Sequence, residues 1–218
     1  MTDACSVKWR YLALWFPFLS ADRWRMQEGA TGEQPDAPLA LVAKVRGAIR
    51  LAAVNARAQA LGIAPGLTLA DARALHPDLL VADMDEAADR HWLKRLAEHC
   101  IDWSPRVATE PPDGITLDIA GSEHLFGGEA GLVAQVEEAF ATLGMNVRMT
   151  VASTAQGAQA LARHAPLPIS DERAALRALP VTALRLEAEA TLGLQRAGLK
   201  RLGDVAARGA ASIASRFG

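Results

Sequence analysis

The order of the apolar segments constrains the fold of this 218-residue chain more than any other feature. Arg10–Phe16 (RYLALWF) is an almost continuous apolar run that stops at Pro17, which is typical of a strand buried on both faces. Once residues 20–83 are set aside, the segments up to Ser153 follow the order strand, helix, strand, strand, helix, strand. This order predicts a ferredoxin-like βαββαβ unit and therefore an α+β fold class.

The segments that follow the insertion differ in the period of their apolar residues. Apolar positions recur at helical spacing in 85–103 and 129–143, which predicts two amphipathic helices, and a third helix is expected at about 154–164. Pro111-Pro112-Asp113 has the composition of a tight turn between two strands. The expected strands are 106–110, 114–120 and 146–152.

Residues 20–83 have a pattern of their own, which predicts an inserted domain with a small sheet. Two strand-like runs, 39–44 and 49–54, flank Arg46-Gly47, as in a β-hairpin. Gly, Glu, Thr and Pro crowd residues 27–36, which predicts a flexible stretch. We also expect short helices that begin at Asn55 and Thr68, and a brief strand at 79–82.

The last quarter of the chain predicts short helices that are broken by Pro180 and Gly198. Residues 197–204 (AGLKRLGD) resemble the second half of a helix-hairpin-helix, whose turn can direct backbone N–H groups at a phosphate. A plain helical packing unit is the alternative. From residue 166 onward there are eight basic and five acidic residues, so Gly198, Lys200 and Arg201 are the candidate DNA-binding residues.

Composition excludes several classes of protein. The net charge of −2 argues against a strongly basic nucleic-acid coat. The two cysteines, Cys5 and Cys100, form no CxxC pair and no secreted disulfide framework, so we expect reduced thiols. No apolar run approaches the ~20 residues that cross a bilayer, and we expect a cytoplasmic protein with no membrane contact.

Several segments resemble those of Y-family translesion DNA polymerases and occur in the same order. Residues 51–79 look like the fingers segment of that family, GITLDI (114–119) looks like its second palm motif, and VASTAQGAQALARHA (151–165) looks like the strand and helix that follow. RYLALWFP, LDIAGSEHLFGGE and LPVTALRL are more narrowly similar to the ImuB family, the catalytically silent member of this group. The resemblance implies a palm at 1–19 and 84–165, inserted fingers at 20–83, and a helical thumb at 166–218 that is incomplete, with the little finger and C-terminal tail expected beyond it.

The resemblance also locates the positions where an active relative holds two divalent metal ions through carboxylates. The matching residues are Trp15, Phe16 and Pro17 on the first strand, and Asp113 and Gly114 in the second motif. One carboxylate remains of three, and its place in a Pro-Pro-Asp-Gly turn explains it without a metal. We therefore expect no metal site and no cofactor, and we hypothesise that Trp15 and Phe16 fill the emptied site by packing.

The triphosphate contacts of active relatives are also missing. The tyrosine and arginine of the first fingers helix are matched by Ala56 and Gln59, and the lysine of the later palm helix is matched within a residue or two by 155–157. Arg57 lies next to the tyrosine position and could reach a phosphate, but a solvated helix arginine is the commoner case. The resemblance therefore implies that the chain is not an enzyme.

The function implied by the resemblance is that of an accessory subunit, or adaptor, in SOS-induced mutagenic translesion DNA synthesis. Its implied partners are the RecA-like protein ImuA, an error-prone C-family DNA polymerase and the β sliding clamp, the last bound through a region beyond Gly218, with DNA as a further ligand. Two alternatives stay open. The first is an active translesion polymerase with displaced metal ligands, which would use Glu110, Asp113 or Asp118. The second is a DNA-binding module that binds no partner protein.

Overall fold

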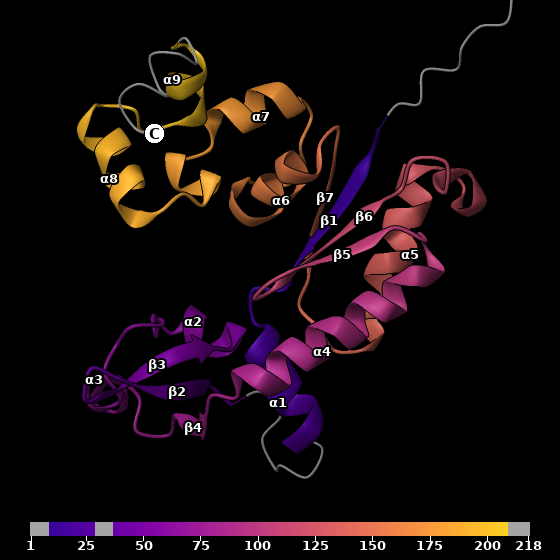
Figure 1. Ribbon diagram of the computed structural model, residues 1–218. Helices are drawn as coiled ribbons and strands as arrows, with labels where there is room; N and C mark the ends of the chain where they lie inside the picture. Colours follow the sequence, from indigo (N-terminus) through magenta and orange to yellow (C-terminus); the bar gives the residue numbers. More distant parts are fainter. Residues whose placement is uncertain (1–8, 29–36, 209–218) are drawn as a thin grey trace, which may run out of the picture.

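A computed structural model of the protein describes residues 9–28 and 37–208, which fold around a four-stranded antiparallel sheet (Figure 1). The strand order is β5-β6-β1-β7, with β1 in the centre, and two helices of 14 residues, α4 and α5, connect the strands in the predicted βαββαβ order. The elements are β1 (Tyr11–Trp15), α4 (Glu86–His99), β5 (Val107–Glu110), β6 (Gly114–Asp118), α5 (Glu129–Thr142) and β7 (Arg148–Ala152). The predicted α+β fold class is confirmed.

Strand β1 is buried on both faces, as its continuous apolar run predicts. Leu12, Leu14 and Phe16 point into a core shared with α4 and α5. Ala13 and Trp15 point the other way, toward α6 (Ala155–His164), because neighbouring residues of a strand alternate between faces. Full burial of each large apolar side chain stabilises the fold by about 1.5–3 kcal/mol. The central strand is therefore fixed in register by two separate cores.

The inserted segment forms a second sheet, with the strand order β3-β2-β4. The turn of its hairpin is formed by Arg46 and Gly47, whose φ angles are 50° and 83°, as a two-residue hairpin with the right twist requires. Asn55 and Thr68 accept N-cap hydrogen bonds from Ala58 and Asp71, so both predicted helix starts are confirmed. The elements are β2 (Leu39–Val45), β3 (Ala48–Val54), α2 (Ala56–Ala60), α3 (Leu69–Leu75) and β4 (Leu80–Asp83).

A helix that the sequence did not predict, α1 (Leu19–Glu28), joins the two sheets. It packs against α4 on one side and against β2 and β3 on the other. The stretch predicted to be flexible begins at Gln27, which belongs to this helix, while residues 29–36 lie outside the described part of the chain. The buried face of α1 includes the charged residues Asp22 and Arg23, which hide the apolar period that would indicate a helix.

The C-terminal segment is helical, as predicted. Its small core consists of Val181, Leu194 and Leu199, and Gly198 turns the chain between α8 and α9 with a φ angle of 80°. No helix within residues 9–28 and 37–208 combines the length and the apolar composition that crossing a bilayer requires. The elements are α7 (Glu172–Ala178), η4 (Val181–Leu184), α8 (Ala188–Arg196) and α9 (Leu202–Ala206).

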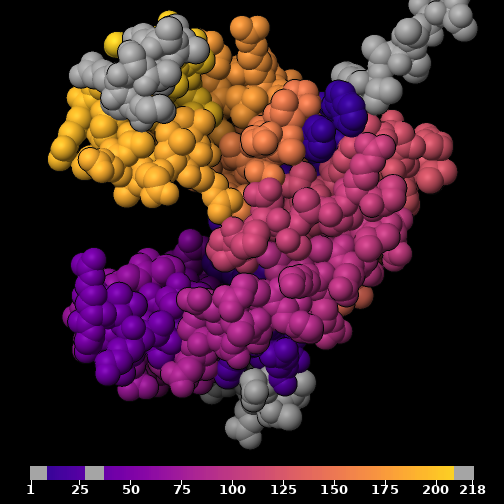
Figure 2. Space-filling model, in the orientation of Figure 1, coloured from indigo at the N-terminus to yellow at the C-terminus, as the bar shows by residue number. Residues whose placement is uncertain are grey.

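The C-terminal helices and the inserted sheet lie on either side of an open cleft, with the central sheet and its helices at the closed end (Figure 2). The turn between β5 and β6 reaches this closed end, where β1 also ends. Any site formed by these two elements therefore faces the cleft.

Candidate functional site

The five positions that the sequence assigned to the metal site do lie together. Trp15 is paired with Gly114 in the register of β1 and β6, and the Phe16 N–H donates a hydrogen bond to the carbonyl of Asp113 over 2.9 Å. Pro17 follows directly and lines the cavity beside Asp113. The end of β1 and the β5–β6 turn are thus held edge to edge.

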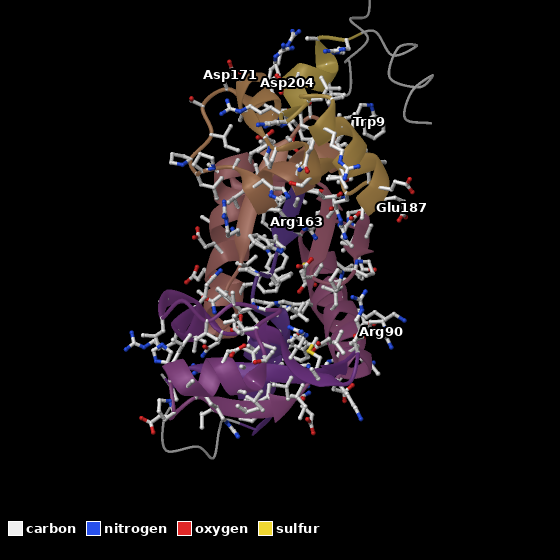
Figure 3. The ribbon with its side chains drawn as sticks, turned by 90° about the vertical axis from the view of Figure 1, so that its left-hand side faces the viewer. Trp9, Arg90, Arg163, Asp171, Glu187 and Asp204 are labelled. Carbon is white, nitrogen blue, oxygen red and sulfur yellow. The ribbon has the colours of Figure 1, made fainter. Side chains whose placement is uncertain are left out.

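The carboxylate of Asp113 has a protein donor at each oxygen. The Trp15 indole Nε1–H donates to Oδ2 over 2.9 Å, and the Arg163 guanidinium donates through Nη2 to Oδ1 over 2.8 Å. Arg163 extends from α6 into the middle of the molecule, below the C-terminal helices (Figure 3), and its side chain is 10% exposed against 30% for Asp113. Charge-assisted bonds of this kind are about twice as strong as neutral ones. The negative charge of Asp113 is therefore compensated within the protein.

Gly114 leaves the space in which Arg163 lies. A Cβ atom at position 114 would lie 2.7 Å from Arg163 Nη2 and 3.0 Å from the Cβ of Glu110, both closer than ordinary contact. A side chain at position 114, a carboxylate included, would therefore require Arg163 to move. The observed position of the Arg163 side chain therefore depends on the glycine at position 114.

The rings of Trp15 and Phe16 lie on opposite faces of the sheet, so they do not pack against each other, and the hypothesis that both fill the site stays a prediction. The Phe16 ring is fully buried in the core, edge-to-face with Phe140 at a centroid distance of 5.1 Å. Trp15 is half-buried on the α6 face, with the Arg148 guanidinium 5.7 Å from its ring centroid, and Arg148 also donates to the carbonyl of Ala165. Of the two rings, that of Trp15 is the one that bonds to the Asp113 carboxylate.

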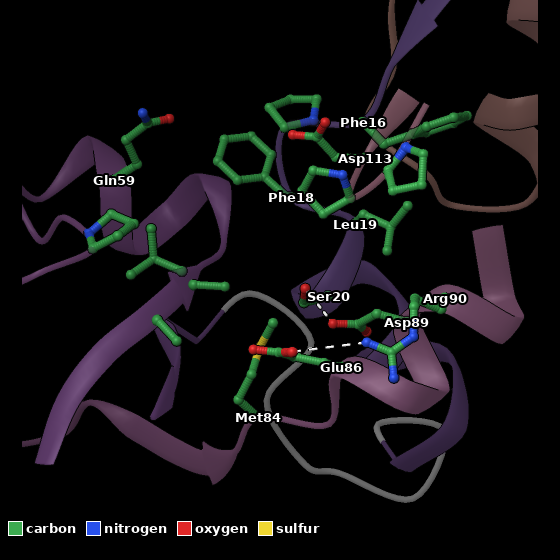
Figure 4. A pocket seen from close by; sticks show the side chains of 17 residues that line it. Phe16, Phe18, Leu19, Ser20, Gln59, Met84, Glu86, Asp89, Arg90 and Asp113 are labelled. Carbon is green, nitrogen blue, oxygen red and sulfur yellow. Dashed lines mark hydrogen bonds and ion pairs between the residues drawn. The ribbon is translucent and has the colours of Figure 1, made fainter. Parts of the chain in front are cut away.

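A cavity of about 590 Å³ lies between the β5–β6 turn and the inserted sheet (Figure 4). Its walls are largely apolar, formed by residues such as Phe18, Pro65 and Met84. Among the lining residues that the structure describes, Arg90 is the one cation, and its guanidinium lies 3.7 Å from Glu86. The cavity therefore offers no unpaired cation to a triphosphate.

The comparisons with known proteins identify the group to which this arrangement belongs. Residues 31–163 match the model of the impB/mucB/samB family. The chain belongs to this family of Y-family polymerase domains. Two curated relatives named Protein ImuB, from the Caulobacter vibrioides strains NA1000 / CB15N and ATCC 19089 / CIP 103742 / CB 15, are 45% identical to it over 162 residues. The match covers 72% of this chain and 35% of each relative, so the chain spans about a third of their length.

Solved structures of Y-family polymerases show the same fold. The chain is similar to the insertion ternary complex of Dbh DNA polymerase, with a TM-score of 0.75, 15% identity, and coverage of 96% of this chain and 63% of that one. It is also similar to DinB from Sulfolobus solfataricus, with a TM-score of 0.70, 15% identity, and coverage of 95% and 62%. The predicted resemblance to Y-family polymerases and to ImuB is confirmed.

The two metal ions of active Y-family members do not fit these residues. Trp15, Pro17 and Gly114 offer no side-chain ligand, and a metal at Asp113 would have to displace the cation of Arg163. Within residues 9–28 and 37–208, no group of three or more His, Cys, Asp or Glu side chains is placed to hold a metal ion. We derive no step of nucleotidyl transfer for this site.

The carboxylates of the displaced-ligand alternative are also paired with arginines. Glu110 lies 3.7 Å from Arg185, and Asp118 accepts a bond of 2.7 Å from Arg106. Asp118 also accepts a hydrogen bond from the backbone N–H of Ala120. It lies at the far end of β6, about 13 Å along the strand from Gly114.

The predicted nucleotide positions lie on the inserted sheet side. Ala56 and Gln59 are both exposed on α2, and Gln59 lines the 590 Å³ cavity apart from Asp113 (Figure 4). Arg57 opens instead into a separate polar cavity with Arg25 and Asn146. Neither Ala56 nor Gln59 carries a charge that could hold a phosphate.

The predicted DNA-binding residues form a tight turn with an internal acceptor. The backbone N–H groups of Lys200 and Arg201 donate to Asp204 Oδ2 over 3.0 and 2.8 Å. Their side chains are exposed, and Gly198 supplies the turn that precedes them. Two amides of the turn are therefore occupied by a carboxylate, while the basic side chains stay accessible. DNA binding by this turn stays a prediction.

Two arginines of the site were missed by the sequence analysis. Arg163 belongs to α6, 50 residues after its partner Asp113, and Arg185 bonds the carbonyl of Pro111 over 3.0 Å from the C-terminal segment. Arg163 lies in a segment that resembles Y-family polymerases, and Arg185 lies in one that resembles ImuB. A chemical argument could have indicated such a residue, because a partly buried carboxylate such as that of Asp113 is expected to have a cationic partner.

Proposed function

We propose that this chain is the noncatalytic, polymerase-like part of an accessory subunit for mutagenic translesion DNA synthesis in the SOS response. The observation that carries the proposal is the pairing of both Asp113 oxygens with Arg163 and Trp15. Two unit charges 4 Å apart near a protein surface interact with about 4 kcal/mol, so a divalent ion beside Arg163 would meet roughly twice that repulsion. Arg163 supplies the positive charge that a metal would otherwise bring.

The partners follow from the likeness to ImuB and are part of the proposal. We propose that the subunit works in the cytoplasm and links a RecA-like ImuA protein, an error-prone C-family polymerase and the β sliding clamp, with the clamp contact outside the described residues. The polymerase fold supports this role because it retains a cleft between the C-terminal helices and the inserted sheet (Figure 2). A scaffold of this shape can hold primer and template without reacting with them.

Primer extension tests the catalytic half of the proposal. The purified chain is incubated with primer-template, all four nucleotides and either Mg²⁺ or Mn²⁺, beside DinB from Sulfolobus solfataricus as the active control. We expect extension by DinB and none by this chain. Incorporation that disappears in the Asp113→Ala variant would establish the alternative of an active polymerase with displaced ligands.

A second function, DNA binding by the C-terminal turn, is favoured by the exposed side chains of Lys200 and Arg201. Reversal of both charges to glutamate should weaken the binding of duplex DNA and reduce its dependence on salt. If binding vanishes and no C-family polymerase is retained in a DNA-free pull-down, the module without partners is the better description. Retention of that polymerase without DNA supports the adaptor.

A further inference from the structure

Strand β5 is an edge of the central sheet with an unused side. Within the described chain it pairs only with β6, and the carbonyl of Arg106, just before β5, accepts from the Asp118 N–H over 3.0 Å. Bonded and non-bonded pairs alternate along an antiparallel ladder. Val107 and Thr109 therefore direct their backbone N–H and C=O groups away from β6, toward the open edge.

A shallow groove of about 260 Å³ runs beside this edge, between β5 and α4. Figure 1 shows β5 at the border of the sheet with α4 close by. Val107 and Thr109 face the helix side, because their partners Leu117 and Ile115 are buried in the core with α4. Ile101, which is 56% exposed, lines the groove. The other lining residues are Lys94, Ala97, Glu98 and Pro105.

We propose that β5 and this groove bind an extended segment of a partner protein by strand addition. The added strand would bond to the outward backbone groups of Val107 and Thr109, and its alternate side chains would face α4. An apolar side chain at such a position would cover Ile101. The backbone hydrogen bonds along the edge would provide affinity, and the groove would provide specificity for the side chain.

The size of the edge identifies the occupant as a short segment rather than a second copy of the chain. β5 has four residues, bounded by Pro111, and two of them offer outward backbone groups. Stable protein dimers bury about 1,200–2,000 Å². Two copies joined along so short a strand would bury far less, whereas a single extended peptide uses the whole edge and the groove together.

Within β5 itself, the two residues with outward backbone groups favour strand addition. Proteins usually protect exposed edges with proline, lysine or a bulge. Here both outward residues, Val107 and Thr109, are β-branched, which favours a strand, and the pairing with β6 is regular. Lys94 and Glu98 place one charge of each sign at the groove, so the apolar contact and the backbone decide the fit.

This inference deepens the proposed function, since its biological meaning rests on the adaptor role. A weak contact at a short edge suits a subunit that engages several partners at once, because linked contacts raise the overall affinity. The experiment below measures peptide binding and does not depend on nucleotide incorporation. The two proposals can therefore fail separately.

The test uses synthetic peptides as the probe. A phage-displayed library of heptapeptides with alternating apolar and polar positions is selected on the purified chain, and the best binder is measured by fluorescence anisotropy. Thr109→Pro removes an outward N–H at an edge position that tolerates proline, Ile101→Asp places a charge in the groove, and Thr109→Ala is the matched control. We expect at least about tenfold weaker binding to T109P and I101D, and unchanged binding to T109A.

A peptide with N-methyl groups on the amides that face β5 keeps its side chains and loses its backbone bonds. It should bind the unaltered chain at least about tenfold more weakly than its parent, which keeps the test valid if T109P unfolds. Slower hydrogen exchange at the amides of Val107 and Thr109 on binding would support strand addition. The proposal would be overturned if no binder is selected, or if T109P and T109A bind the peptide equally. It would also be overturned if the unaltered chain self-associates and T109P does not, since the occupant of the edge would then be a second copy.

Discussion

At the scale of single residues, the site depends on how the charge of one carboxylate is compensated. Asp113 occupies the position of a catalytic aspartate in the resemblance to active relatives, yet its oxygens are bonded to Trp15 and Arg163. The surrounding residues agree with this use, since Gly114 leaves space for the arginine. We therefore expect that removal of Asp113, or of its partner Arg163, lowers the free energy of unfolding.

Replacement of Arg163 by methionine should lower the free energy of unfolding by about 1–2 kcal/mol, because Asp113 would lose a charge-assisted bond at a largely buried donor. Urea denaturation followed by circular dichroism measures the loss. Arg90→Met is the control, since both side chains of the Arg90–Glu86 pair are exposed, and it should cost less than about 0.5 kcal/mol. Equal losses in the two variants would contradict the account.

His164, next to Arg163, gives the same region a pH dependence. Burial lowers the pKa of His164, with a further contribution from the neighbouring charges of Arg163 and Arg148. The folded state therefore favours the neutral imidazole, so the contribution of His164 to stability is complete above the ordinary pKa of 6.5 and is lost as the pH falls through the lowered value. Between about pH 7.5 and 5, the unfolding free energy should fall more steeply for the unaltered chain than for His164→Gln. Identical slopes would show that the imidazole titrates alike in both states.

At the scale of elements, α1 is held to α4 by a buried ion pair. Arg23 Nε donates to Asp89 Oδ1 over 2.6 Å, with side-chain exposures of 5% and 7%, and the Ser20 hydroxyl donates to the other oxygen of Asp89 over 2.7 Å. These contacts join the central sheet unit to the inserted sheet. The orientation of the inserted segment depends on them.

Asp89→Ala should destabilise the chain by about 3–5 kcal/mol, because it leaves the Arg23 guanidinium buried without its partner. Thermal unfolding checks this, with Glu86→Ala as the control on the same helix, since the Glu86–Arg90 pair is exposed. A loss for D89A as small as that for E86A would mean that water reaches Arg23 in the variant.

The same elements show what the sequence could predict. β1, the hairpin of β2 and β3, and helices α4 and α5 follow a clear local period, and their bounds agree with the expectation to within a few residues. Helix α1 was missed because a buried ion pair takes the place of apolar positions. The bond between Asp113 and Arg163 joins residues 50 apart, and no local pattern carries that information.

At the scale of the whole molecule, the chain has the architecture of a Y-family polymerase, and our proposal is that it uses this architecture without the chemistry. The segments predicted as palm, fingers and thumb enclose a cleft (Figure 2), and the likeness to Dbh DNA polymerase covers 96% of the chain. The order of the segments predicted this fold, because it fixes which strands become neighbours. It did not predict that arginines of α6 and of the C-terminal segment would meet the β5–β6 turn, since that depends on how the helices pack across the sheet.

The most direct test of this account is a titration with Mn²⁺, followed by electron paramagnetic resonance, in the presence of primer-template and an incoming nucleotide. If Arg163 and Trp15 engage the Asp113 carboxylate, the unaltered chain and Asp113→Asn should bind the same amount of Mn²⁺ with the same affinity. A saturable site of the unaltered chain that is lost in Asp113→Asn would show a metal at this carboxylate and would contradict the account.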